Sequence, residues 1–304
     1  MTVLECLESR LAAYEYAPRS LQTNAYLTRL VRQSPLGSMP AEDTAQTRAA
    51  ARDLLAQILA AGHGRTAEQL YTWLHTCCPA ILAEVRRPRF ARRSAVYVTA
   101  DDARRLLSNC SDRSLWLAVA IALSCGLRRG ELCGLRWADI DMQACVITIK
   151  NQRVRVPGRG LVDMPPKSEA GFRPLPIPRH LAEALSEQYM IMQADTLLCG
   201  PQGPYVLPGP TGQGEDPNRL DRAFQALCNA SGVRCTLHGL RHTMASIAAN
   251  NNVPIRVLQS ILGHASYTTT AKYYTHTYSD ATQRALEEVQ KHLTLNQGVP
   301  GSSP

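Results

Sequence analysis

The 304-residue sequence lacks several features that mark other classes of protein. Its longest apolar run, at 115–127, has 13 residues, whereas a helix needs about 20 to span a bilayer. The N-terminus shows no basic segment followed by an apolar one, so we expect no signal peptide. None of the ten cysteines forms a C-x-x-C pair. We therefore expect reduced thiols and a cytoplasmic protein without a membrane partner.

Motifs for nucleotide and metal chemistry are also missing. The chain has no G-x-x-x-x-G-K-[ST] loop, which argues against an ATP-binding P-loop. In HGLRHT (238–243) no glutamate separates the histidines, so this is not the H-E-x-x-H motif of zinc enzymes. No cluster of carboxylates suggests a metal site either. The sequence predicts an activity that uses neither a metal nor a cofactor.

Positive charge is plentiful by contrast. The formal net charge is +8 and the pI about 9.1, which favours a polyanionic partner. RRPRFARR (86–93) concentrates this charge in five arginines, Arg86, Arg87, Arg89, Arg92 and Arg93. Pro88 disfavours a continuous helix there. The segment is either a solvated linker or a linker that grips a DNA backbone.

Apolar periodicity predicts a mostly α-helical chain with a small antiparallel β-sheet in its second half. Residues 1–85 have helical spacing, and 86–95 form the basic linker. A second domain is expected over 96–294, followed by a disordered tail at 295–304. Helices are expected from 218 to about 250, at 254–262 and at 279–293. Strands are expected at 145–150, 152–156 and 173–177, with Thr99 or Asp101 as a helix cap.

Four weak signals in the second domain carry chemistry. Arg128 follows Gly126, which ends or bends an apolar helix, and Glu131 can orient it. Lys167 lies in a turn between two predicted strands. His238 and Arg241 share a helix face at i, i+3, with His242 pointing elsewhere. His264 follows Gly263, which ends another helix. Taken singly, each fits a surface or structural residue equally well.

Together these residues suit phosphoryl transfer. Two arginines can clamp a phosphodiester, a lysine can protonate a leaving 5′-oxygen, and histidines can move protons. A tyrosine hydroxyl can attack phosphorus, and the resulting ester stores the bond energy, so that rejoining needs no ATP. ILGHASYTTTAKYYTH (261–276) contains three tyrosines and no acidic residue that would repel a phosphate.

The four stretches around these residues, GLRRGELCGLRWADID, PPKSEAGFRPLPI, HGLRHT and LGHASYTTTAKYYTH, resemble in order and spacing the tyrosine recombinases, or phage integrases. The resemblance covers about residues 95–293, and residues 15–85 more weakly resemble the family's helical core-binding (SAM-like) domain. It implies a site-specific recombinase that cuts and rejoins double-stranded DNA through a 3′-phosphotyrosine, without metal, for a phage or mobile element. The implied catalytic residues are Arg128, Lys167, His238, Arg241, His264 and a tyrosine.

The resemblance places that tyrosine nine or ten residues after His264. Tyr274 precedes Thr275-His276 and fits the longer spacing, so we predict Tyr274 as the nucleophile. Tyr273 fits the shorter spacing and is the alternative; the loser of the pair is expected to pack. Tyr267 is expected in the core.

The resemblance further implies a homotetramer on paired DNA sites, with residues 279–293 docking on a neighbour and an accessory directionality factor as a possible partner. We expect no arm-binding domain of the family before residue 15, which leaves open a simple two-domain recombinase or a trimmed integrase. Two other functions stay open, a DNA-binding protein of the same fold that does not cut, and a type IB topoisomerase. The DNA target and the choice among integration, excision, inversion and dimer resolution are not predicted.

Overall fold

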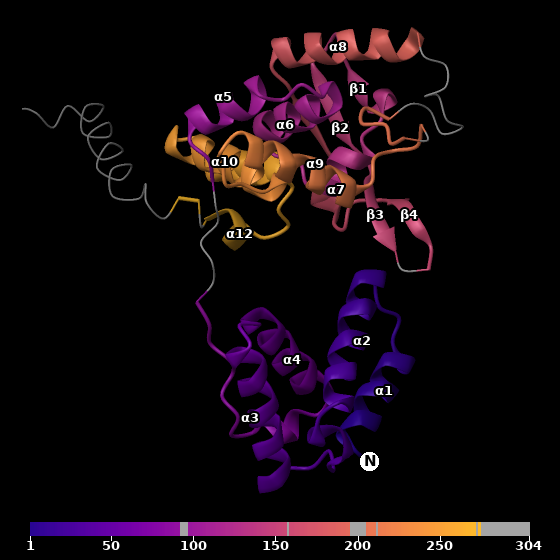
Figure 1. Cartoon of the computed structure of the whole chain (residues 1–304), viewed down its shortest axis with the longest axis vertical. Helices are drawn as coiled ribbons and strands as arrows, with labels where there is room; N and C mark the ends of the chain where they lie inside the picture. Colours follow the sequence, from indigo (N-terminus) through magenta and orange to yellow (C-terminus); the bar gives the residue numbers. More distant parts are fainter. Residues whose placement is uncertain (92–96, 157, 195–204, 211, 272, 275–304) are drawn as a thin grey trace, which may run out of the picture. The chain divides into compact units, whose positions relative to one another are not determined.

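The computed structural model describes residues 1–91, 97–156, 158–194, 205–210, 212–271 and 273–274. The chain divides into two compact units (Figure 1). The first comprises Met1–Ser94 together with Val156–Gly160, and the second comprises Ala95–Arg155 and Leu161–Pro304. The predicted domain limits at 85 and 95 remain predictions. Arg92, Arg93, the predicted helix at 279–293 and the predicted tail at 295–304 lie outside the described residues.

The first unit is a bundle of four helices. These are α1 (Val3–Ala13), α2 (Pro18–Arg32), α3 (Ala45–Ala60) and α4 (Gly64–Cys77), with 3₁₀ turns η1 (Pro35–Ser38) and η2 (Pro79–Leu82). Thr2 and Glu5 form a capping box at the start of α1, and Thr44 caps α3 by accepting from the Thr47 amide. The apolar faces meet in one core that includes Leu7, Leu27, Leu70, Leu74 and Ile81.

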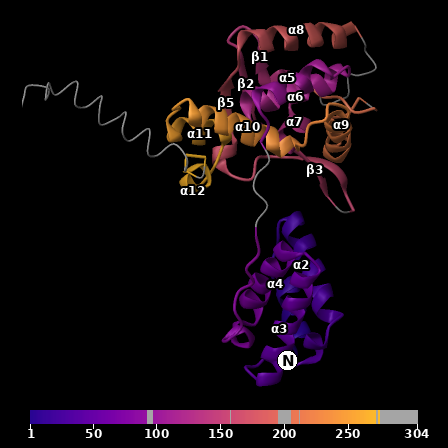
Figure 2. The same ribbon diagram turned by 60° about the vertical axis from the view of Figure 1, so that its left-hand side comes forward.

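The second unit has a helical body. Its helices are α5 (Ala100–Ser108), α6 (Arg113–Cys125), α7 (Arg129–Gly134), α8 (Arg179–Ala194), α9 (Pro217–Ala230), α10 (Leu237–Asn250), α11 (Ile255–Leu262) and α12 (Tyr267–Ala271). The apolar helix α6 buries most of its residues and packs against α10. Figure 2 shows α8 along the side of this unit opposite α12. Thr99 caps α5, which confirms one of the two predicted caps.

The strands form two small sheets. In the first, β1 (Ile140–Asp141), β2 (Val146–Ile149) and β5 (Arg173–Pro176) lie in the order β1-β2-β5 with antiparallel pairing. In the second, β3 (Gln152–Val156) pairs with β4 (Gly160–Met164). The predicted fold class, mostly helical with small antiparallel sheets, is therefore confirmed.

Three details of the sequence-based prediction were wrong. The three predicted strands do not share one sheet, because β3 turns back onto β4, a strand that the prediction missed. Gly158, which has φ +73° and lies in the turn between the two strands, was the overlooked signal. The helical stretch at 218–250 is interrupted between α9 and α10, where Gly232 has φ +65°. Helix α8 was not predicted, although its apolar residues repeat at helical spacing.

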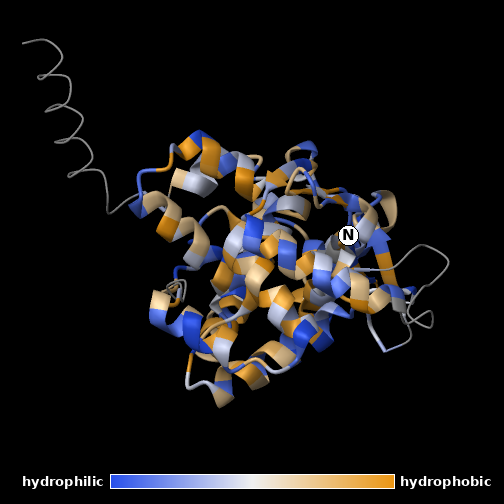
Figure 3. Ribbon diagram, turned by 90° about the horizontal axis from the view of Figure 1, so that it is seen from above, coloured by the Kyte–Doolittle hydropathy of each residue, from blue (hydrophilic) through white to orange (hydrophobic). Residues whose placement is uncertain are grey.

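Hydrophilic and hydrophobic segments alternate along the helices, as expected for amphipathic elements (Figure 3). Within the described ranges no helix is both long and apolar enough to cross a membrane. The nine cysteines that the structure describes are free thiols, and five of them are buried.

Candidate functional site

Two glycine-ended helices bring three of the predicted site residues, Arg128, Arg241 and His264, to neighbouring positions. Gly126 closes α6 in the left-handed conformation (φ +63°), as predicted, and the chain turns so that Arg128 directly precedes α7. Gly263 closes α11 in the same way (φ +60°). A Cβ on Gly263 would lie 2.7 Å from the Ala170 carbonyl oxygen and 2.7 Å from Arg173 Nη1. Only glycine permits this close approach of α11 to the strand β5.

Arg128 is held by the predicted partner and by the end of α11. Its Nη1 donates to Glu131 Oε1 (2.7 Å), and its backbone N–H donates to Glu131 Oε2 (2.9 Å). Its Nη2 donates to the Gly263 carbonyl (2.9 Å). The Arg128 side chain remains 38% exposed, whereas Glu131 is 2% exposed. Arg128 is thus oriented by a buried carboxylate while part of its guanidinium faces solvent.

Arg173, at the start of β5, is a member of the site that the sequence analysis did not identify. Its guanidinium donates to both oxygens of Glu131 (2.9 and 3.2 Å), to the Gly171 carbonyl and to the Ile261 carbonyl. Burial raises the pKa of Glu131, but the hydrogen bonds and charge of Arg173, with those of Arg128, outweigh it and lower that pKa overall. Arg173 therefore keeps Glu131 ionised and supports Arg128 indirectly.

A sequence signal for Arg173 existed. Arg173, Leu175 and Ile177 alternate along the strand and are all buried, so they share its inward face. An arginine at an inward position needs a buried acceptor.

Arg241 is buried, with 1% of its surface exposed. It projects from α10 and donates from Nη1 to the Gly126 carbonyl (2.5 Å) and from Nη2 to the Leu262 carbonyl (2.5 Å). These carbonyls belong to the ends of α6 and α11, the same ends that position Arg128 and His264. Arg241 therefore ties together the two turns that form the site.

The site carries more positive than negative charge. Arg128, Arg173 and Arg241 surround the single carboxylate of Glu131 among the described residues. Burial, followed by the nearby charges of Arg128 and Arg173, lowers the pKa of Arg241 to about 9. A guanidinium stays protonated at neutral pH even so, and the lowered pKa means that this environment is unfavourable to a cation. A bound anion would relieve that unfavourable charge.

His264 follows Gly263, whose carbonyl accepts from Arg128. Its Nδ1 lies 2.9 Å from the Thr270 hydroxyl, and its backbone N–H donates to the Gln259 carbonyl (3.2 Å). Thr270 is fully buried on α12. The imidazole is thereby oriented by the short helix that precedes the two tyrosines.

His242 does not point away from His238, as the sequence analysis expected. The two rings lie 4.5 Å apart between centroids in an edge-on arrangement. The correction has a simple cause, since residues at i and i+4 also share a helix face. His242 Nδ1 lies 2.5 Å from the Tyr273 hydroxyl, and the two rings are 5.5 Å apart. The structure thus aligns His238, His242 and Tyr273.

The two neighbouring tyrosines take different positions. Burial raises the pKa of Tyr273, and the charge of Arg241 opposes this effect. Tyr274 donates its hydroxyl to the Val253 carbonyl. Both rings pack on the small cluster of Met244, Ala245, Ala249, Leu258 and Leu262. In this conformation Tyr273, rather than the predicted nucleophile Tyr274, has its hydroxyl beside a histidine of the site; Tyr274 as nucleophile stays a prediction.

Tyr267, which was expected in the core, is 41% exposed and lies under the guanidinium of Arg256 (5.4 Å). That expectation was wrong. Thr270 is the buried residue of the short helix α12, whereas Tyr267 begins this helix with its side chain on the exposed side.

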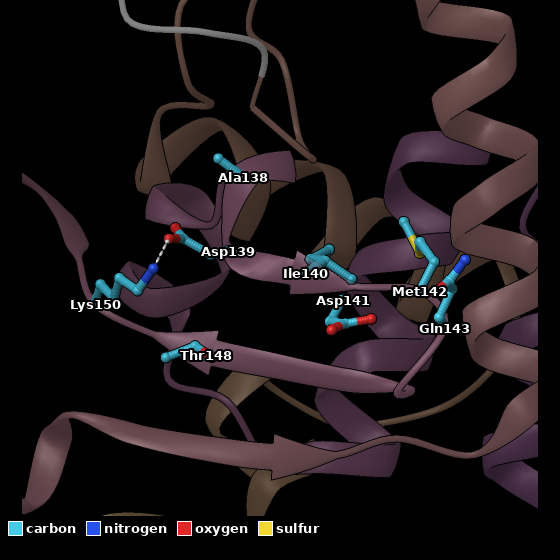
Figure 4. A pocket seen from close by; sticks show the side chains of 8 residues that line it. All are labelled: Ala138, Asp139, Ile140, Asp141, Met142, Gln143, Thr148 and Lys150. Carbon is cyan, nitrogen blue, oxygen red and sulfur yellow. Dashed lines mark ion pairs between the residues drawn. The ribbon is translucent and has the colours of Figure 1, made fainter.

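Lys167 is exposed in the bend between β4 and β5. Of the four lysines in the sequence, Lys150 and Lys167 fall in the described residues. Lys150 serves another contact, because its Nζ pairs with the nearly buried Asp139 (3.1 Å) at a shallow surface pocket (Figure 4). That pocket also contains Asp141, and its acidic lining disfavours a phosphate.

The three described linker arginines differ in their surroundings. Arg87 donates to Glu68 (3.2 Å), so one of them is engaged within the first unit, while Arg86 and Arg89 are exposed. Their role in DNA contact stays a prediction. Among the described residues no group of three or more His, Cys, Asp or Glu side chains could hold a metal ion.

Comparison with known proteins agrees with this geometry. The phage integrase family profile matches residues 97–280, more than half of the chain. A XerC-like tyrosine recombinase from Caldanaerobacter subterraneus subsp. tengcongensis is 28% identical over 182 residues, which is 55% of this chain and 46% of that protein. The tyrosine recombinase XerA of Thermococcus onnurineus is 25% identical over 224 residues, covering 71% of this chain and 69% of its own. The chain thus spans about half the length of the first of these relatives.

Solved structures show the same fold. The integrase of transposon Tn1549, in complex with a circular intermediate DNA, superposes with a TM-score of 0.78 at 22% identity and covers 95% of this chain and 99% of its own. A lambda integrase tetramer bound to a Holliday junction gives 0.65 at 20% identity, with 89% and 76% covered. On the family match and the site geometry together, the chain belongs to the phage integrase family of tyrosine recombinases.

Proposed function

We propose that this protein is a site-specific DNA recombinase that cuts and rejoins DNA through a 3′-phosphotyrosine intermediate. The observation that carries the proposal is the arginine cluster at the ends of α6 and α11. There three arginines surround one carboxylate, and a histidine and a tyrosine hydroxyl lie beside them. An excess of fixed positive charge, oriented before the substrate arrives, suits the pentavalent phosphorus of a strand-transfer transition state.

Each residue has a proposed part. Arg128 and Arg241 bind the non-bridging oxygens of the scissile phosphate, and His238 and His264 contribute hydrogen bonds and move protons. The tyrosine phenol attacks phosphorus, the bond to the 5′-oxygen breaks, and Lys167 gives that oxygen its proton. The tyrosine then holds the 3′-phosphate as an ester. A 5′-hydroxyl attacks this ester in the reverse step, which reseals a strand and releases the tyrosine.

The nucleophile comes from the Tyr273–Tyr274 pair. The spacing in the sequence predicts Tyr274, whereas the observed conformation supports Tyr273, whose hydroxyl lies beside His242. With Tyr274, the reaction requires release of its hydroxyl from the Val253 carbonyl. With Tyr273, His242 is placed to accept the phenolic proton.

The wider organisation is part of the proposal. Residues 1–85 would form the core-binding domain, 86–95 the basic linker, 96–294 the catalytic domain and 295–304 a tail. DNA-bound integrases and the lambda tetramer on a Holliday junction support a tetramer on paired DNA sites. A cytoplasmic location is also part of the proposal. The Tn1549 integrase supports a role in moving a mobile element. An accessory directionality factor has no support beyond the family resemblance.

Covalent trapping tests the proposal. Nicked duplexes made from the DNA that flanks the gene are incubated with wild type, Tyr273→Phe and Tyr274→Phe in the presence of a chelator. Denaturing gels then reveal a protein–DNA adduct. We expect an adduct with wild type and its loss in one of the two variants, which identifies the nucleophile. Binding without any adduct would overturn the proposal in favour of a protein of this fold that does not cut DNA.

A further inference from the structure

A second cluster of charged groups lies at the strand pair β3–β4, apart from the arginine cluster of Arg128, Arg173 and Arg241. Asp163 on β4 accepts hydrogen bonds from Arg153 Nη1 (2.7 Å), Arg136 Nη2 (2.8 Å) and the Tyr205 hydroxyl (2.5 Å). The Arg153 and Asp163 side chains are 5% and 14% exposed. A chain does not bury ions at random, because each must be matched with a partner.

Tyr205 also contributes its aromatic ring to this cluster. The Arg136 and Arg153 guanidinium groups lie 5.4 and 5.3 Å from the centre of the Tyr205 ring. Burial raises the pKa of Asp163, but the hydrogen bonds from Tyr205, Arg136 and Arg153 prevail and lower it overall. Asp163 is thus held as a carboxylate with three donors on two oxygens.

The cluster connects β4 to the element that follows Arg128. The Val206 backbone N–H donates to the Leu135 carbonyl (3.0 Å), and Arg136 and Tyr205 form an isolated β-bridge. Leu135 ends α7, the helix that begins directly after Arg128. Figure 1 shows α7 next to the start of the β3–β4 pair. These contacts therefore fix the position of Asp163 relative to α7, the helix that Arg128 directly precedes.

From Asp163 the chain runs four residues to Lys167. The Gln152 side-chain amide of β3 donates to the Pro165 carbonyl (2.9 Å), which restrains the backbone two residues before the lysine. Beyond the lysine, Gly171 donates its N–H to the Ser168 carbonyl (2.8 Å), and its own carbonyl accepts from Arg173 (3.0 Å). The loop that carries Lys167 is thus held at both ends. The Asp163 cluster holds the end at β4, and Arg173 of the arginine cluster holds the end at Gly171.

We propose that Asp163, Arg153 and Tyr205 are positioning residues that set the place of Lys167 relative to Arg128, and so govern protonation of the leaving 5′-oxygen. This inference rests on the proposed function. It predicts that the cluster affects only the protonation of the leaving oxygen. The arginines that bind the phosphate and the tyrosine that attacks it do not lie on β4. A misplacement of about 1 Å at a reacting group can reduce a rate about 100-fold.

A change of leaving group isolates that step. In a DNA substrate with sulfur in place of the bridging 5′-oxygen, the bond to phosphorus breaks to release a thiolate, which needs no proton from Lys167. Lys167→Ala should slow cleavage of the oxygen substrate by about 10²–10⁴-fold and leave the sulfur substrate nearly unaffected. Tyr205→Phe keeps the ring beside both guanidinium groups and removes the hydroxyl, which donates to Asp163 and accepts from Arg153 Nη1 (3.4 Å). We expect it to slow the oxygen substrate by about 10-fold or more and the sulfur substrate by less than about 2-fold.

Gln152→Ala, which releases the Pro165 carbonyl, should show the same selectivity with less risk to folding. Tyr189→Phe is the matched control. Tyr189 lies on α8, packs against Trp137 and is not part of the cluster. This variant should leave both rates unchanged. Equal slowing of both substrates by Tyr205→Phe and Gln152→Ala, with Lys167→Ala still rescued by sulfur, would overturn the inference and leave the proposed function intact. Absence of cleavage of either substrate by wild type would overturn the proposed function instead.

Discussion

The two units of this chain use charge in opposite ways. Among the described residues, the buried polar side chains of the first unit are two threonines, Thr28 and Thr47. The second unit buries ions, among them Glu131, Arg153, Arg173 and Arg241. The first unit could be held by its apolar core alone. Buried charge carries a large desolvation cost, so its concentration in one unit indicates where a charged substrate is handled.

The largest expected difference concerns the buried carboxylate. Glu131→Gln leaves Arg173 buried without an ionic partner, and we expect the free energy of unfolding of the second unit to fall by about 3–5 kcal/mol. Urea unfolding followed by circular dichroism measures this change. Glu187→Gln is the control, because Glu187 pairs with Arg113 on the surface and is 66% exposed. Its effect should stay within about 1 kcal/mol, and equal losses in the two variants would remove the contrast between buried and exposed charge.

The excess positive charge predicts stabilisation by anions. With sulfate at about 100 times its dissociation constant, wild type should gain about 2.7 kcal/mol of stability over chloride at equal ionic strength. Arg241→Met should lose most of that gain, because it removes the cation whose pKa is lowered by burial and by the neighbouring arginines. Thermal unfolding in the two salts provides the measurement. Arg113→Met, a surface change, should keep this gain in stability. If it loses as much of the gain as Arg241→Met does, sulfate acts on the whole surface and not on the arginine cluster.

A smaller effect is expected from acid. The folded pKa of Glu131 lies below its usual value of 4.5, so its ion pairs stabilise the fold above that value. This contribution is lost as the pH falls through the folded pKa. Stability measured between about pH 5 and about pH 3 should therefore decline more steeply in wild type than in Glu131→Gln. Parallel curves would show that other carboxylates dominate acid unfolding.

The smallest effect is expected in the first unit. Arg32 pairs with Glu8, but these side chains are 60% and 43% exposed. Arg32→Ala should lower the stability of the first unit by about 0.2–1 kcal/mol at most. Leu70→Ala, in the core of the same unit, should lower it by about 2–5 kcal/mol. Chemical denaturation of both variants tests whether apolar packing outweighs charge there.

Much of the site was accessible from the sequence, because its signals are local. Gly126 and Gly263 were expected to end helices, and both do, since a left-handed terminal residue favours glycine. Glu131 was expected to orient Arg128, because three residues separate them in one turn of helix. Motif order alone then suggested the family, which the match to residues 97–280 establishes.

Other features depend on residues far apart in the chain. Glu131 and Arg173 are 42 positions apart, and Arg153 and Tyr205 are 52 apart. No local period connects such pairs, so only the packing of β5 against α7 and of the 205–210 segment against β3 brings them together. The His242–Tyr273 contact has the same origin and brings the Tyr273 hydroxyl beside His242.

The sequence by itself therefore determined the family, the helix ends and the residue types that handle a phosphate, because these follow from local conformation and from chemistry. The tertiary structure decided which of these groups are buried, which carboxylate balances which arginine, and how the Lys167 loop is held. The reason is physical. The cost of burying a charge and the distance between two charges are properties of the packed chain, and neither exists until distant segments meet.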